Sequence, residues 1–162
     1  RLRSRGLGDV YKRQEGGIQA MLDDAAMAVM VLNGGSAVPL WNTWLDGLQE
    51  EAPAGGEIDV AGIQAIFAHA LAALADISGA KVGDKTMMDA LIPASAAVAA
   101  YAGSSADELF AAAAKAAAEG AENSKNFVSK FGRAKSYGTK TIGTPDAGAV
   151  SMSWFFQGLA RE

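Results

Sequence analysis

The sequence holds no cysteine, a single histidine and four prolines in its 162 residues. The lack of cysteine excludes disulfide bonds, thiolate zinc sites and cysteine nucleophiles. The one histidine, His69, lies in an apolar stretch that favours a helix face or the core, and metal sites with several histidines are excluded. No apolar run reaches the roughly 18 to 20 residues of a membrane span, and no apolar signal segment follows the basic start. We therefore expect a cytoplasmic protein that does not contact a membrane.

Alanine is the most abundant residue, at 35 of the 162 positions. These alanines gather where glycine and proline are rare, which favours helices. Apolar side chains recur at helical spacing in six stretches, and no stretch has a convincing strand pattern. We expect an all-α protein with helices over about 18–32, 36–48, 59–77, 86–101, 105–127 and 146–159.

Polar and small residues mark the ends and weak points of these helices. Asp59 and Asp146 are suited to cap helix N-termini, and Ser105 is the first residue of a capping box. Pro93 falls inside a predicted helix and should kink it or delay its start. Gly120 is the weakest point of the alanine-rich helix.

Charge is distributed unevenly along the chain. Residues 1–14 carry a net charge of +4, which leaves −8 for residues 15–162 because the whole chain carries −4. An acidic body argues against a nucleic-acid surface, since duplex binding relies on Lys and Arg that neutralise phosphates. The basic head taken alone is compatible with a short nucleic-acid arm.

A different origin explains the head better. Its segment Asp9-Val10-Tyr11-Lys12-Arg13-Gln14 looks like the in-frame translation of the mosaic-end adapter used in transposon-based sequencing libraries. Segments of this kind are set aside before the fold is considered. We therefore expect residues 1–14 to be a non-native or disordered head, and residues 15–162 to be a single, partial helical domain whose own N-terminus is missing.

Three segments interrupt the helices with chemistry suited to an anion or a nucleotide. Asn33-Gly34-Gly35-Ser36 precedes a helix, where backbone N–H groups and the positive helix end attract phosphate oxygens. Gly83-Asp84-Lys85-Thr86-Met87 begins another helix, without the spacing of a Walker A loop. The glycine-rich stretch 132–148 is predicted as a polar loop, with an arginine that can grip phosphate and an aspartate that can accept from ribose or adenine. Taken singly, the three are as readily explained as a helix end, a turn and a surface loop.

Taken together, the three segments follow the order and separation found in one family. They comprise Gly34–Trp41, the GDKTMMD segment Gly83–Asp89, and Gly132-Arg133-Ala134 followed by TIGTPDAGA over Thr141–Ala149. With these motifs, the chain from about Ile18 onward resembles the nucleotide-binding L subunit of dihydroxyacetone (glycerone) kinase. The resemblance implies a barrel or bundle of antiparallel amphipathic helices, here without its first helices, with ADP or ATP bound at one rim.

The resemblance also implies which residues bind the nucleotide. They are Gly35, Ser36 and Ala37 at the phosphates, Met87 against the adenine with Thr86 beside it, Arg133, Asp146, Ala147 and Gly148 around the pocket, and Ser78 where the family often has a glycine. Ala37, Val38 and Ala147 depart from the family's Ser, Gly and Pro, which removes one hydroxyl beside the phosphates.

One motif of the family is absent from the sequence. The family carries a G-D-x-D-H-G loop whose aspartates hold two magnesium ions between the phosphates, and none of the 162 residues forms such a loop. We therefore assign no metal ligand and no catalytic residue here. We also expect the chain by itself not to transfer a phosphoryl group, because the transfer depends on positioning and on the charge of the metal ions.

The resemblance implies a phosphotransferase subunit that presents a phosphoryl group to a triose held on a partner K subunit. Mg²⁺ would belong to the complete protein, and the nucleotide is either exchanged as ATP or rephosphorylated as ADP by a phosphotransferase-system protein. The alternatives are a nucleotide-binding module without turnover, a related kinase domain acting on another ketose or on fatty acids, and a purely structural alanine-rich bundle.

Deletion of residues 1–14 should leave the melting temperature unchanged within error, because this segment offers no apolar stripe to bury. Calorimetric scans of the full and shortened chains check this. A loss of several degrees in the shortened chain would overturn the adapter interpretation.

Overall fold

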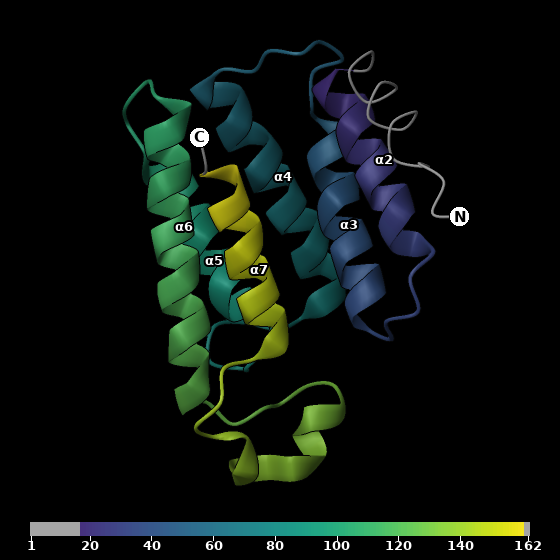
Figure 1. Ribbon diagram of the computed structural model, residues 1–162, viewed down its shortest axis with the longest axis vertical. Helices are drawn as coiled ribbons and strands as arrows, with labels where there is room; N and C mark the ends of the chain where they lie inside the picture. The colour runs from purple at the N-terminus through teal and green to yellow at the C-terminus, as the bar shows by residue number, and fades with distance from the viewer. Residues whose placement is uncertain (1–16, 161–162) are drawn as a thin grey trace, which may run out of the picture. The chain divides into compact units, whose positions relative to one another are not determined.

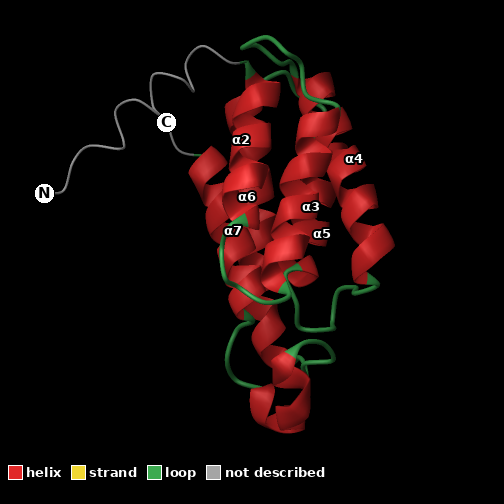
Figure 2. Ribbon diagram, turned by 90° about the vertical axis from the view of Figure 1, so that its right-hand side faces the viewer, coloured by secondary structure: helices red, strands yellow, loops and turns green. Residues whose placement is uncertain are grey.

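The computed structural model describes residues 17–160, which form six α-helices and two 3-10 segments. Within this range no residue lies in a β-strand (Figure 2). The predicted all-α class is therefore confirmed. The predicted head, residues 1–14, lies outside the described residues.

The chain divides into two compact units, one up to Leu74 and one from Ala75 onward. We describe each unit by itself, so the single domain and the closed barrel stay predictions. The first unit holds α2 (Ile18–Met30), α3 (Ala37–Glu50) and most of α4 (Val60–Ser78). The second holds α5 (Met88–Ala100), α6 (Ala106–Asn123), the 3-10 segments η1 (Ser124–Asn126) and η2 (Arg133–Thr141), and α7 (Ala147–Leu159) (Figure 1).

The three predicted N-caps are confirmed by their hydrogen bonds. The Asp59 carboxylate accepts from the N–H of Gly62 at 2.7 Å, before α4. The Ser105 hydroxyl accepts from the N–H of Glu108 at 3.3 Å, before α6. The Asp146 carboxylate accepts from the N–H of the third residue of α7 at 2.9 Å.

Two of the predicted secondary-structure assignments are wrong. The alanine-rich helix was expected to reach residue 127, but α6 ends at Asn123 and the chain tightens into η1. The stretch 132–148, predicted as a loop, contains the helical turns of η2. Gly138 interrupts η2 with φ +55°. Because glycines are typical of loops, they made the short helical turns on either side of Gly138 hard to predict from the sequence.

In the first unit, α3 packs closely on α4. The Trp44 ring meets the Phe67 ring edge to face, with centroids 5.6 Å apart, and both side chains are buried. A Cβ atom on Gly47 would lie 2.8 Å from the Cα of Ala70, so this crossing requires glycine. The α2–α3 pair is tied by the Asn42 amide, which donates to the carbonyl of Ala26 at 3.1 Å.

Helix α4 is long and apolar enough to cross a membrane by length and composition alone. The sequence-based expectation had found no such stretch. Five residues of α4 are buried, namely Ile63, Ile66, Phe67, Ala70 and Leu74. They form part of the core of the first unit.

In the second unit, α5, α6 and α7 lie side by side around buried Leu91, Leu109 and Phe156 (Figure 1). Pro93 lies inside α5, as the sixth residue of a helix that begins at Met88, so the proline does not delay the start of the helix. Proline has no N–H, so the carbonyl of Asp89, four residues earlier, loses its helical partner. Gly120 of α6 packs at that carbonyl: a Cβ on Gly120 would lie 2.1 Å from its oxygen. The glycine is therefore a packing requirement as well as a weak helix former.

We expect Gly120→Ala to destabilise the protein by about 1 to 3 kcal/mol, because the added methyl collides with backbone that cannot turn away. Gly158→Ala is the matched control, since Gly158 lies in α7 with nothing within 4 Å of its Cβ position. That change should be neutral or stabilise by about 0.5 to 1 kcal/mol. Urea unfolding of both variants measures the difference, and equal midpoints would contradict the packing account.

Candidate functional site

The GDKTMMD segment folds around the carboxylate of its own last residue. One oxygen of Asp89 accepts from the N–H of Gly83 and the other from the N–H of Thr86, each at 2.6 Å. Asp89 is only 1% exposed. These two N–H groups therefore bind an internal anion, and the segment supports the site rather than offering these two amides to a phosphate.

Lys85 points out of this loop and is buried. Its Nζ donates to the carbonyl of Ser124 at 2.9 Å and to the carbonyl of Thr144 at 2.6 Å. The loop is thereby joined to η1 and to the turn before α7.

Asp84 anchors the other side of the same loop. Its carboxylate accepts from Lys130 Nζ at 2.6 Å and from the N–H of Lys81 at 3.0 Å. The hydrogen bond from Lys130, followed by the one from the Lys81 backbone, lowers the pKa of Asp84 below its ordinary value. The carbonyl of Asp84 also accepts from the N–H of Lys130, at 3.1 Å.

The turn before α7 is held in the same way. The N–H of Asp146 donates to the hydroxyl of Ser124 at 2.8 Å, while its carboxylate caps α7. Burial raises the pKa of Asp146, and the charge of Asp89 raises it further. The hydrogen bonds from the Ala149 and Gly148 amides lower this pKa, as does the charge of Lys85. This carboxylate is thus held between opposing influences at the positive end of a helix.

Met87 and Gly148 bring the two segments into contact. A Cβ on Gly148 would lie 3.3 Å from the Cβ and the backbone N of Met87, and 3.0 Å from an Asp146 carboxylate oxygen. Met87 itself is buried, whereas Ala147 is exposed. Of the predicted nucleotide residues, Thr86, Met87, Asp146, Ala147 and Gly148 therefore meet at one place in the second unit.

The other predicted residues lie elsewhere. Gly35, Ser36 and Ala37 form the exposed start of α3 in the first unit, where Gly35 has φ +60° and the Ser36 side chain makes no capping bond. Ser78 is the last residue of α4, and its hydroxyl accepts from the N–H of Ala80 at 3.3 Å. Arg133 is the exposed first residue of η2.

Sequence reasoning missed the supporting residues Lys85, Asp89 and Ser124. A signal existed for the first two, because a lysine and an aspartate flank the apolar pair Met87-Met88 where a core helix begins. Nothing in the sequence marked Ser124. The stretch 124–145 also contains five basic residues and no acidic one: Lys125, Lys130, Arg133, Lys135 and Lys140.

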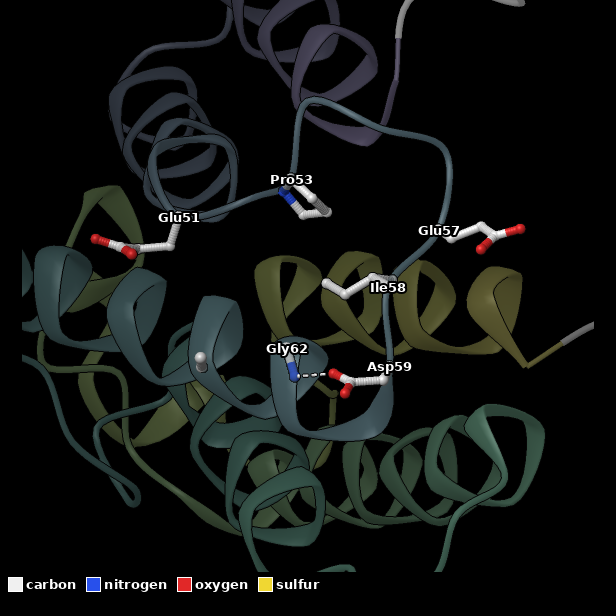
Figure 3. Close-up of a pocket in the computed structure, with 7 residues that line it drawn as sticks. Glu51, Pro53, Glu57, Ile58, Asp59 and Gly62 are labelled. Atoms are coloured by element: carbon white, nitrogen blue, oxygen red, sulfur yellow. Dashed lines mark hydrogen bonds between the residues drawn. The ribbon is translucent and has the colours of Figure 1, made fainter.

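Each unit contains a cavity lined by described residues. In the first unit, a groove of about 600 Å³ is lined by Pro53, Ile58 and three acidic side chains, Glu51, Glu57 and Asp59 (Figure 3). It adjoins the C-terminal end of α3, whereas Gly35 lies at the opposite end, and its acidic lining disfavours phosphate. In the second unit, a cavity of about 360 Å³ lies beside Asp89 and is lined further by Pro93, Glu119, Gly120, Asn123, Asn126 and Phe127. Its two carboxylates disfavour phosphate there too.

The DAK2 domain family matches residues 5–161, and the chain belongs to this family. It is 31% identical over 154 residues to an L-erythrulose kinase of Pectobacterium atrosepticum, a match that covers 91% of this chain and 25% of that protein. It is 33% identical over 138 residues to an L-erythrulose 1-kinase of Mycolicibacterium smegmatis, covering 79% of this chain and 22% of that protein.

A third relative is the ADP-binding subunit DhaL of the PEP-dependent dihydroxyacetone kinase 2 of Listeria innocua. The two are 29% identical over 147 residues, which covers 90% of this chain and 67% of that subunit. The resemblance drawn from the motifs is thus correct at the level of the family. The chain spans about a quarter of the erythrulose kinases that it matches.

We expect Lys130→Met to move acid unfolding to higher pH. Because the pKa of Asp84 is lowered in the folded protein, its ionised form stabilises the fold at any pH above the ordinary pKa of an aspartate. This stabilisation disappears as the pH falls through the pKa that Asp84 has in the folded protein. Without Lys130 the pKa of Asp84 in the folded protein rises, so the protein begins to lose stability at a higher pH. Circular dichroism across an acid titration measures the midpoint, with Lys135→Met, an exposed cation of η2, as control. Coincident curves for the two variants would contradict the Asp84–Lys130 assignment.

Proposed function

We propose that this chain is the nucleotide-binding part of a ketose kinase, with ADP or ATP bound in the second unit at the start of α7. The observation that carries this proposal is the convergence of Thr86-Met87 with Asp146 and Gly148. Each of these segments was assigned to the nucleotide by the resemblance alone. Their meeting at a helix N-terminus supports that assignment, because such ends attract anions.

The two ends of a nucleotide need different surroundings. Gly148 packs closely on Met87 and Asp146, since a methyl group there would lie 3.3 Å from the Cβ of Met87 and 3.0 Å from the Asp146 carboxylate. An adenine would use this apolar contact, and its amino group would donate to the carboxylate. The phosphates would use cations of the acid-free stretch 124–145, with Arg133 as the bidentate partner. The prediction that Gly35, Ser36 and Ala37 contact phosphate rests on the resemblance alone.

The residues present do not fit a magnesium site. Residues 17–160 contain no group of three or more His, Asp or Glu side chains able to hold a metal ion. The G-D-x-D-H-G loop of the family is also missing from the sequence. We therefore propose that this chain by itself does not transfer the phosphoryl group.

The relatives support a proposal for the acceptor and for the partner. We propose a partner K subunit or domain that holds the ketose, and a cytoplasmic location. A dihydroxyacetone kinase subunit is named among the relatives, and its PEP-dependence favours rephosphorylation of ADP through a phosphotransferase-system protein. A second candidate substrate is erythrulose, which is favoured by the kinases of Pectobacterium and Mycolicibacterium.

A nucleotide-binding module without turnover is the main alternative to a kinase subunit. Both predict ADP binding. They are separated by reconstitution of this chain, extended by an N-terminal segment that carries the G-D-x-D-H-G loop, with a K subunit, a ketose, ATP and Mg²⁺. Ketose phosphate formed by the reconstituted mixture, and not by either part alone, would favour the kinase.

We expect Arg133→Ala to weaken ADP binding by about 10- to 100-fold, because a charge-assisted contact contributes about 1.5 to 3 kcal/mol. Isothermal calorimetry measures the dissociation constant. Lys115→Ala removes an exposed cation from α6, outside the basic stretch, and should leave the affinity unchanged. Equal affinities for the wild type and Arg133→Ala would remove this residue from the site.

A further inference from the structure

We infer that Lys85 is a positioning residue of the nucleotide site, whose buried ammonium group holds the turn that presents Asp146. The inference rests on the proposed nucleotide site at the start of α7. No motif assigns a role to Lys85; it is the geometry of its side chain that points to one.

The backbone of Lys85 is the first observation. Its φ is +59°, and it is the one non-glycine residue of 17–160 with a positive φ. A long side chain in this conformation is strained, and the strain persists only where the surroundings hold it in place. Glycine would fit the backbone better. The contacts of the lysine side chain therefore have to offset this strain.

The burial of the ammonium group is the second observation. Lys85 is 5% exposed, and the described residues place no carboxylate within ion-pair distance of its Nζ. A buried charge is unfavourable unless hydrogen bonds compensate it. Here the carbonyls of Ser124 and Thr144 accept from Nζ, at 2.9 Å and 2.6 Å. These acceptors lie 39 and 59 residues away along the chain, so one side chain fixes two distant segments.

Both segments converge on Asp146. Thr144 lies two residues before it, and the Ser124 hydroxyl accepts from its N–H. Lys85 thus holds the Asp146 turn directly through Thr144 and indirectly through Ser124. Without the ammonium group, the carbonyls of Ser124 and Thr144 would lose this donor and the turn would be free to shift away from Met87.

The charge of Lys85 has a second effect on the same carboxylate. The charged groups that act on Asp146 are Asp89, from α5, and Lys85, from the loop; from η1 it faces the neutral hydroxyl of Ser124. Burial and Asp89 raise the pKa of Asp146, and Lys85 opposes them. Loss of Lys85 should therefore raise this pKa further. Loosening of the turn alone would reduce the burial of Asp146, which is the largest cause that raises its pKa, and so would move the pKa the other way.

The test compares Lys85→Met, which keeps the length and removes the charge, with Lys81→Met, which removes an exposed lysine of the same loop. Lys85→Gly is the second variant, because glycine suits the positive φ and keeps the loop foldable. Two measurements are made on each: the ADP dissociation constant across a pH series, and the carboxyl carbon titration of Asp146 by NMR without nucleotide.

We expect both Lys85 variants to bind ADP about tenfold or more weakly near neutral pH, with the acid limb of the affinity profile and the Asp146 titration moved to higher pH. Lys81→Met should match the wild type in both. An unmoved Asp146 titration and unchanged affinity in the Lys85 variants would overturn the inference. If the wild type binds no ADP while the Asp146 titration still moves, the proposed nucleotide function fails and the electrostatic role of Lys85 stands without it.

Discussion

The candidate site depends on one interaction: the buried carboxylate of Asp89 accepts hydrogen bonds from two backbone N–H groups. Because Gly83 and Thr86 each donate to it at 2.6 Å, the loop between them is closed into a fixed shape. That shape directs Lys85 toward the turn before α7 and places Met87 beside Gly148. At 1% exposure the polar oxygens of Asp89 need hydrogen-bond partners, and these two N–H groups supply them.

A second constraint connects this loop to the helices. Pro93 removes the helical partner of the Asp89 carbonyl, and Gly120 allows α6 to approach that carbonyl. The approach fixes the end of α6, from which the chain passes directly into η1 and Ser124. Ser124 then receives the N–H of Asp146 on its hydroxyl. Packing between two apolar helices thus determines where the polar turn of the site lies.

The sequence was sufficient to predict what local rules decide. Helical spacing predicted the six helices, and the capping rule found Asp59, Ser105 and Asp146. It could not predict contacts between distant segments, such as those of Lys85 with Ser124 and Thr144, since no local pattern encodes them. For the same reason Gly120 was read only as a weak helix former, and the helical turns of η2 were missed among glycines.

The central claim is that a nucleotide binds where the Met87 loop meets the start of α7. An ADP titration followed by amide NMR tests it directly, because each amide reports on its own surroundings. The account predicts that the resonances of Met87, Gly148 and Arg133 shift together and saturate, while those of Glu57 and Gly62 in the acidic groove of the first unit stay in place. Shifts confined to that groove, or none at all, would contradict the account.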